Sequence, residues 1–292
     1  MKKLKYLSML SRLFILILLG LTVVVVTAAE ITPTFLVASS AALDNPHDLK
    51  LSPDGKYLFV SDVGHNRIAI LDSDSLELVG SFGSDHQSGT HDIDFDTQGR
   101  AYVADTHNNR VTIYDINGTT ANLVGEINER IRGPEGVLVH PNGRVYVAGA
   151  WSGNVVVYEN GQVVGEHSGL SSPHDLEVTN DGDIWLSDSG NHRLLLLSPE
   201  LKIKRELGPQ KYDFNGVRYM DLLADGTLVV ADKNNHVIKF IAADDSLLFV
   251  LGTGKPGLGV NKFVTPEGVE VKHQTLWLSD SGNNRIVKYR LD

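Results

Sequence analysis

Short apolar stretches alternate with turn residues from about residue 30 to the C-terminus, and their order repeats six times. Each repeat has an acceptor-rich start, an apolar strand, a turn, a second strand that usually ends in Ser-Asp or Ala-Asp, and a third strand. The repeats begin 44, 44, 39, 44 and 49 residues apart, at His47, His91, Glu135, His174, Arg218 and Glu267. A period of this length is typical of four-stranded propeller blades.

The strands of each repeat are rich in Val, Ile, Leu, Tyr and Phe, and turn pairs such as Asp54-Gly55 and Asp181-Gly182 separate them. Such an antiparallel meander has two exposed edges and cannot bury its faces alone. We therefore predict one all-β domain over residues 30–292, in which six four-stranded antiparallel blades stack around a channel and act as a monomer.

The two ends of the chain indicate how the ring closes. The last repeat ends after its third strand, at residues 285–291, whereas the segment TPTFLVASS at 32–40 precedes the first repeat. We predict that this N-terminal strand completes the last blade, because the pairing satisfies both open edges without a covalent bond.

The first 29 residues differ from the repeats. Four basic residues precede or flank the apolar run 13–26, and small residues follow it. This pattern predicts a signal peptide or an uncleaved signal anchor, and hence an exported domain in the periplasm or outside the cell. An uncleaved anchor would be the domain's one attachment to a membrane.

Composition excludes several classes of function. The chain has no cysteine, so disulfides and thiol chemistry are excluded. Without the four basic residues of the leader, 22 Lys and Arg remain against 36 Asp and Glu, a formal charge of −14. Such a domain repels nucleic acid. No Gly-x-Ser-x-Gly or phosphate-binding loop supports a serine esterase or a nucleotide hydrolase.

The residues that begin the repeats are the candidate functional site, because the start of an inner strand lies at the mouth of the channel. Three of them precede an aspartate, in the pairs His47-Asp48, His91-Asp92 and His174-Asp175, and Arg218 precedes Tyr219. Ionisable groups in a concavity are functional candidates. Alternatively, these groups neutralise one another around channel waters. If the strand register differed by one residue, these side chains would point into the blade and not into the channel.

Metal chemistry is one possibility for this ring. Zinc sites often use three protein ligands and leave a position for water or substrate. Candidate ligands for zinc or iron are His91 and His174 with either His47 or Glu267. Arg218 would then orient an anionic substrate, and Tyr219 or Glu135 would move a proton. The aspartates behind the histidines would instead suit Ca²⁺.

Four repeats share an Asp and an Arg five residues apart, in the segments SDVGHNRI at 61–68, ADTHNNRV at 104–111, SDSGNHRL at 187–194 and SDSGNNRI at 279–286. We interpret these pairs as structural links between strands. Repeat three has Gly149 and Asn154 instead, and repeat five has Val237 in the Arg position. The four segments resemble the NHL repeat, which implies a propeller but leaves function open, because that family includes enzymes and interaction modules.

A second resemblance concerns the channel mouth. His91 and His174 match histidine positions of the peptidyl-hydroxyglycine amidating lyases. The resemblance to those lyases implies a zinc ion held by three histidines at the channel mouth, an assisting Tyr and Arg, and a structural calcium ion in the channel. This chain departs from that pattern, because Glu267 stands in the third alternate blade and His47 in an adjacent one. The cysteine pairs of those lyases are also missing.

Two hypotheses of function follow. The first is an exported binding or scaffold module that takes a peptide, protein or glycan at the channel mouth. The alternative is a metal-dependent enzyme, either a lyase similar to the amidating enzymes or a lactonase-type hydrolase.

Overall fold

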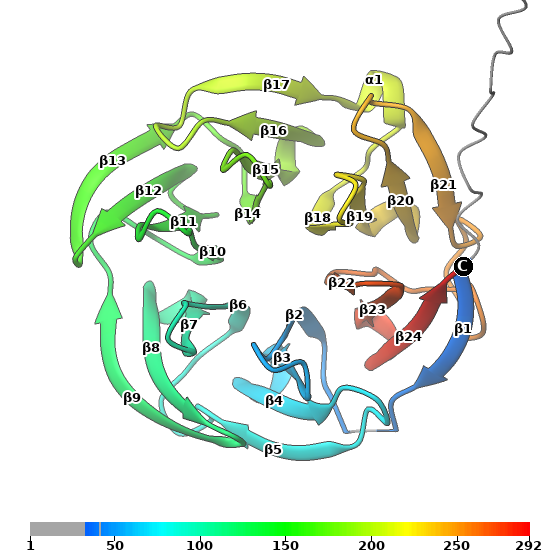
Figure 1. The fold of residues 1–292 in the computed structure, drawn as a ribbon, viewed down its shortest axis with the longest axis horizontal. Helices are drawn as coiled ribbons and strands as arrows, with labels where there is room; N and C mark the ends of the chain where they lie inside the picture. The colour runs from blue at the N-terminus through cyan, green and yellow to red at the C-terminus, as the bar shows by residue number, and fades with distance from the viewer. Residues whose placement is uncertain (1–32, 41) are drawn as a thin grey trace, which may run out of the picture. The chain divides into compact units, whose positions relative to one another are not determined.

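The computed structural model describes residues 33–40 and 42–292, and the predicted signal segment lies outside these residues. The described residues form six four-stranded antiparallel sheets arranged in a ring around a central channel (Figure 1). The predicted six-bladed β-propeller is therefore confirmed. Within the described residues, no helix is long and apolar enough to cross a membrane.

Each blade runs outward from the channel, strand by strand. Blade 1 has β2 (Pro46–Leu51), β3 (Tyr57–Asp62), β4 (Arg67–Asp72) and β5 (Leu78–Phe82), and blade 2 has β6 (Thr90–Phe95), β7 (Arg100–Asp105), β8 (Arg110–Asn117) and β9 (Thr120–Ile127). Blade 3 has β10 (Pro134–Val139), β11 (Val145–Gly149), β12 (Asn154–Glu159) and β13 (Gln162–Ser168), and blade 4 has β14 (Pro173–Val178), β15 (Ile184–Asp188), β16 (Arg193–Leu197) and β17 (Ile203–Leu207).

The last two blades follow the same order. Blade 5 has β18 (Val217–Leu222), β19 (Leu228–Asp232), β20 (Val237–Ile241) and β21 (Leu247–Leu251), and blade 6 has β22 (Val269–Lys272), β23 (Thr275–Asp280), β24 (Arg285–Leu291) and β1 (Pro33–Ala38). Short helical turns follow the second strand of five blades, at η1 (Val63–His65), η2 (Thr106–Asn108), η3 (Ser189–Asn191), η4 (Lys233–Asn235) and η5 (Ser281–Asn283). The one α-helical turn among the described residues is α1 (Pro209–Tyr212).

The N-terminal strand closes the ring as predicted. β1 pairs antiparallel with β24, from Pro33 opposite Leu291 to Ala38 opposite Val287. Figure 1 shows β1 as the outermost strand of blade 6. The pairing removes the open edge of β24 and joins the first and last described strands of the chain.

The core lies between neighbouring blades. Leu49, Val60 and Ala69 of blade 1 pack in one cluster with Trp277 and Ile286 of blade 6, and all five are buried. The other blade interfaces are built in the same way from apolar side chains of successive sheets. Each blade thus buries its faces on its neighbours, as the repeat pattern requires.

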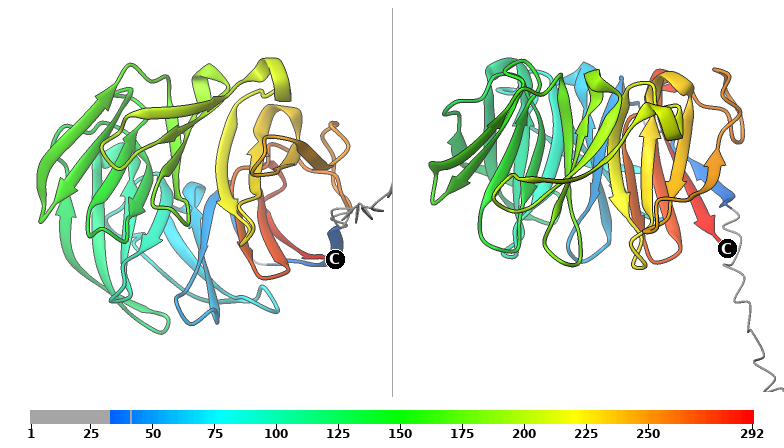
Figure 2. Two further views of the ribbon diagram at one scale, coloured as in Figure 1. Left: turned by 45° about the horizontal axis from the view of Figure 1, so that its top comes forward. Right: turned by 90° about the horizontal axis from the view of Figure 1, so that it is seen from above.

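We call the face where the inner strands begin, and where the η turns lie, the upper face; the opposite face is the lower face (Figure 2). The Asp–Arg pairs lie at the upper face and are structural, as predicted. Asp188 is fully buried, accepts a hydrogen bond from the Ser171 backbone N–H (2.7 Å), and pairs with Arg193 Nε (2.7 Å) and Asn191 Nδ2 (2.8 Å). In blade 5 the Arg position holds Val237, and Lys239 Nζ reaches Asp232 Oδ2 instead, at 2.5 Å.

The residue before each Arg position joins one blade to the next. Asn66, Asn109 and Asn284 have φ between 52° and 56°, and their side-chain oxygens accept backbone N–H groups of the following blade at 2.7–2.9 Å. His192 and His236 do the same through Nδ1. Asparagine suits this position because it tolerates the left-handed conformation.

Replacing Asp188 with Ala should cost about 2–4 kcal/mol of the free energy of unfolding, because the change leaves Arg193 Nε and the Ser171 backbone N–H without an acceptor. Urea unfolding of residues 30–292 measures this cost. The matched control is Asp54→Ala, since the Asp54 side chain is 51% exposed in a lower-face turn. Equal losses in the two variants would contradict a structural role specific to the buried carboxylate.

Candidate functional site

A β-bulge in the inner strand controls where the candidate residues point. The pairing of β2 with β3 jumps from Pro46 to Leu49, so His47 and Asp48 lie in the irregular part of the strand. The same jump occurs at residues 91–92, 174–175 and 218–219. A bulge re-aims side chains that would otherwise alternate between the two faces of a sheet. Both residues of each pair can therefore approach the channel.

The six predicted residues do converge at the upper mouth of the channel. The rings of His47 and His91 meet edge to face, with centroids 4.5 Å apart. His174 Nε2 lies 2.5 Å from Glu135 Oε2 and also contacts Arg218. Arg218 Nε is 3.3 Å from Glu267 Oε2, a contact of opposite charges without an aligned hydrogen bond.

Lys233, which the sequence analysis did not select, completes this group. It is the first residue of η4 and forms an ion pair with Glu267. The Glu267 and Glu135 side chains are only 1% and 10% exposed, whereas Arg218 and Lys233 are 19% and 24% exposed. Of these four charged groups, the two cations are therefore the more accessible to solvent.

His91 is held as a neutral base. Its Nδ1 lies 2.8 Å from the Gly89 carbonyl and 2.9 Å from Thr106 Oγ1, and Thr106 donates to the Pro134 carbonyl. The ring therefore carries its proton on Nδ1 and keeps a lone pair on Nε2. Burial lowers the pKa of His91, although Glu135 opposes this shift. Burial and then His91 also lower the pKa of His47.

Glu135 is held as a carboxylate. Burial opposes its ionisation, but the hydrogen bond and the charge of His174 more than offset burial and lower the pKa of Glu135 to about 2. A carboxylate with so low a pKa is a poor proton donor near neutral pH. Its predicted role as a proton carrier therefore has less support than its role as the partner of His174.

Tyr219 lies below the ring rather than in it. Its side chain is 1% exposed, and its hydroxyl lies 3.0 Å from the His91 carbonyl and 2.9 Å from the Glu135 carbonyl. Burial raises its pKa well above the usual value. Tyr219 thus crosses the channel from blade 5 and bridges blades 2 and 3, so its geometry supports a structural role and not the predicted proton transfer.

The predicted metal ligands are brought close together, but their partners do not fit a metal ion. His174 Nε2 is occupied by Glu135 and Arg218, and Glu267 is occupied by Lys233 and Arg218. In residues 33–40 and 42–292, no group of three or more His, Asp or Glu is arranged to hold a metal. Two cations among the donors disfavour a third. The zinc or iron site stays a prediction that this arrangement does not support.

Below the mouth, the channel is lined by carboxylates that hold the blades together. Asp92 Oδ2 accepts the Val137 N–H of the next blade at 2.5 Å, and Asp175 Oδ2 accepts that of Met220 at 2.6 Å. Asp48 contacts Asp92, and burial followed by this neighbour raises the pKa of Asp48. The predicted calcium ligands Asp92 and Asp175 are therefore engaged with backbone, and calcium binding also remains untested.

The lower part of the channel contains one cation among four acids. Lys50 Nζ lies 3.3 Å from Glu177 Oε2 and 3.7 Å from Glu270 Oε2. Burial lowers the pKa of Lys50, but the negative charges of the two glutamates, Asp94 and Asp221 outweigh burial and raise this pKa above its usual value. Burial in turn raises the pKa of Asp94 to about 7 and that of Asp92 to about 6.

An aromatic shelf flanks the upper mouth. Trp151 is 50% exposed and stacks on His107 at a centroid distance of 5.7 Å and an angle of 20°. His107 in turn meets His91 edge to face at 6.4 Å. We call Trp151 and His107 the aromatic shelf. The fold brings Trp151, from the turn after β11, next to the histidines of the mouth.

Comparisons with known proteins agree with this architecture. The NHL repeat family model matches residues 170–195, in blade 4, and a lactonase family model, described as a seven-bladed beta-propeller, matches residues 27–141. The fold and the repeat define the protein as a six-bladed β-propeller with NHL-type repeats. The comparison with curated protein sequences gave no match.

Several solved structures share the fold. Virginiamycin B lyase from Staphylococcus aureus aligns with a TM-score of 0.63 and 13% identity over 90% of this chain and 100% of that one. A streptogramin B lyase has a TM-score of 0.64 and 15% identity over 90% and 87%. A structural genomics protein of unknown function from Bacteroides thetaiotaomicron has a TM-score of 0.72 and 13% identity over 89% and 72%. At these identities the likeness shows the fold alone.

The raised pKa values of Asp94 and Asp92 predict that stability falls as pH rises. Between the unfolded value near 4 and the folded values near 6 and 7, the folded state binds more protons than the unfolded state, so each step up in pH costs stability. The loss is complete above about pH 7 and absent below about pH 4. For Asp94 alone it is on the order of 2–4 kcal/mol.

Melting temperatures of the wild type and Asp94→Asn between pH 5 and 8 measure this effect. The fall with pH should be shallower in the variant, whatever its absolute stability, because its amide does not ionise. Identical slopes in the two proteins would show that Asp94 does not titrate in this range.

Proposed function

We propose that this propeller is a binding module whose ligand contacts the upper mouth of the channel, and that the ligand is a peptide presenting a carboxylate there. The observation that carries the proposal is the arrangement of charge at this mouth: Arg218 and Lys233 are 19% and 24% exposed, and the carboxylate that both contact, Glu267, is buried. A guanidinium and an ammonium side by side suit an anionic group of a ligand.

The rest of the protein makes this cationic mouth unusual. The whole chain has a formal charge of −10. A local positive site on an acidic protein favours an anion at one place and repels it elsewhere, which gives orientation as well as affinity.

The aromatic shelf supports a peptide as the ligand. Trp151 offers half of its surface to solvent, and its stacking on His107 fixes the ring plane. Rigid aromatic side chains contact peptide side chains at low cost in conformational entropy, and they are common in binding surfaces. A carboxylate at Arg218 and an apolar side chain on the shelf would together orient a short peptide.

A binding screen with short peptides that carry either a free or an amidated C-terminus tests this proposal by fluorescence anisotropy. We expect the free carboxylate to bind about 10- to 100-fold more tightly than the amide, the range for a charge-assisted hydrogen bond. Arg218→Gln should lose most of this preference, and Arg218→Lys should retain part of it.

Lys56→Gln is the matched control, because the Lys56 side chain is 73% exposed near a lower-face turn. It should leave binding unchanged. Equal binding of the acid and the amide, or an unchanged preference in Arg218→Gln, would contradict the proposed role of the mouth.

The second candidate is an enzyme of the lyase or lactonase type, and one observation favours it. His91 is neutral, keeps its Nε2 lone pair and is oriented through Nδ1, which are the properties of a general base. The lyases with a similar fold support this class by analogy only. Such an enzyme would use His91 to take a proton from a substrate that Arg218 orients.

Elemental analysis of residues 30–292, purified without an affinity tag or chelator, distinguishes a metal-dependent enzyme from a binding module or an enzyme that uses no metal. Arg218 and Lys233 contact His174 and Glu267, and backbone N–H groups engage Asp92 and Asp175. We therefore expect well under one equivalent of zinc, iron or calcium per chain. The double variant His91→Ala with His174→Ala is the control. Stoichiometric metal that this variant loses would favour the metalloenzyme and justify assays with hydroxyglycine peptides and lactones.

A further inference from the structure

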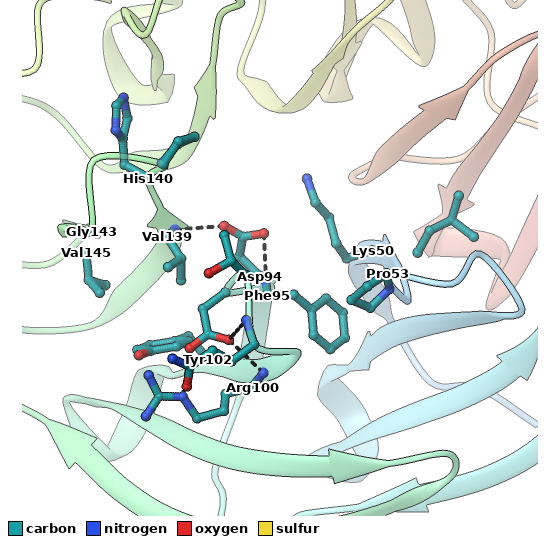
Figure 3. A pocket seen from close by; sticks show the side chains of 15 residues that line it. Lys50, Pro53, Asp94, Phe95, Arg100, Tyr102, Val139, His140, Gly143 and Val145 are labelled. Atoms are coloured by element: carbon teal, nitrogen blue, oxygen red, sulfur yellow. Dashed lines mark hydrogen bonds and ion pairs between the residues drawn. The ribbon is translucent and has the colours of Figure 1, made fainter.

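The lower face carries a pocket that the upper mouth does not explain. It has a volume of about 520 Å³ and lies where blades 1, 2 and 3 meet (Figure 3). Its innermost residues, Lys50 and Asp94, belong to the lower part of the channel. The others lie at the lower ends of the inner strands, in the turns that follow, and at the start of the second strands β7 and β11. Pockets that bind small ligands commonly have volumes of about 300–1,000 Å³.

The walls of this pocket are apolar and rigid. Phe95 is held edge to face against Phe59 at a centroid distance of 5.1 Å. Tyr102 is 7% exposed and packs in the cluster that contains Val145. Pro53 lines the pocket from the turn after β2. These side chains form a preformed surface for a flat apolar group.

Arg100 supplies a charged group at the pocket. Its Nε binds Asp96 Oδ2 at 2.7 Å, and Asp96 Oδ1 is fixed by the backbone N–H groups of Gln98 and Arg100, each at 2.9 Å. The Arg100 side chain is 40% exposed, and its two terminal nitrogens have no hydrogen-bond partner among the described residues. The guanidinium is thus oriented from one side and open on the other, which suits a carboxylate that binds through two oxygens.

The charges within the pocket do not oppose an anion. Asp96 is already paired with Arg100. Asp94 is half-buried at the inner end and accepts the backbone N–H groups of Val139 (2.7 Å) and Phe95 (2.8 Å). Lys50 lies at the same end. The carboxylates of the lining are therefore engaged by hydrogen bonds, and Lys50, which also contacts Glu177 and Glu270, adds a cation at the inner end.

A similar pocket between blades 4 and 5 lacks these features. Its volume is about 480 Å³, and its lining includes Trp185 and Arg205. There Arg205 Nη1 is 3.0 Å from Asp245 Oδ1, and the guanidinium lies 4.9 Å over the Trp185 ring. The arginine is engaged and covers the aromatic wall. Of the two pockets, only the one at blades 1–3 combines an open aromatic wall with an open guanidinium.

We propose that the pocket at blades 1–3 is a second binding site, separate from the upper mouth, for a small organic anion with a flat apolar body. Its carboxylate binds the terminal nitrogens of Arg100, and its apolar body lies against Phe95 and Tyr102. The Tyr102 hydroxyl, which has no hydrogen-bond partner among the described residues, is available as a further donor.

Phenylacetate is the probe. Phenylacetamide, which lacks the charge, and acetate, which lacks the ring, are the control ligands. Isothermal titration and saturation-transfer NMR of residues 30–292 measure their binding. We expect phenylacetate to bind at least tenfold more tightly than either control, because each of them lacks one of the two contacts. Arg100→Gln should weaken phenylacetate binding about tenfold or more, and Arg100→Lys should recover part of it.

Two further variants locate the site. Arg130→Gln changes a 59% exposed arginine outside the pocket and should leave phenylacetate binding unchanged. Arg218→Gln changes the upper mouth and should leave the Arg100-dependent part of the binding in place. Melting curves confirm that each variant is folded. Binding lost in Arg218→Gln but kept in Arg100→Gln would place the anion at the upper mouth and overturn the proposal. Equal affinity for phenylacetate and phenylacetamide would overturn it as well.

Discussion

The inner edge of each blade sets the constraint on which the rest of this structure depends. An inner strand has a partner strand on one side only, so the N–H groups on its channel side need other acceptors, and a buried N–H without one is costly. Side-chain carboxylates of the preceding blade meet this need at Val137, Val139, Met220, Val271 and Leu51. The acidic lining of the channel is therefore part of the blade-to-blade packing.

Two inner strands have glycine where the others have a channel-lining carboxylate or Tyr219, and there the backbones of neighbouring blades approach more closely. A Cβ atom at Gly136 would lie 2.2 Å from the His174 carbonyl oxygen, and one at Gly268 would lie 2.5 Å from that of His47. Glycine is required at both positions by this close approach. The middle of the channel is thus filled by structural contacts, including those of Tyr219, and the side chains that remain open to a ligand lie at its two ends.

The sequence predicted the blades, the closing strand and the Asp–Arg links because each of these follows from a repeated local pattern. It did not predict Lys239 as the partner of Asp232, because Lys239 lies two residues after Val237, which occupies the Arg position of the repeat. Lys233 and the Trp151–His107 stack were missed for a related reason: their partners come from other blades, and their contacts depend on how neighbouring sheets are rotated. Tyr219 was assigned to chemistry because a sequence shows a hydroxyl but not the two carbonyl groups that it contacts.

The β-bulge explains how one strand start can place one side chain in the packing between blades and another at the channel mouth. In each irregular pair the second residue, such as Asp92, Asp175 or Tyr219, contacts backbone of other blades and is constrained by it. The first residue reaches the mouth, and there the six blades present three histidines, two glutamates and an arginine. In blades 1 to 5 a bulge fixes the backbone position of this first residue, while its side chain has no required backbone partner in the next blade. The chemistry of the mouth can therefore differ from blade to blade without loss of the ring.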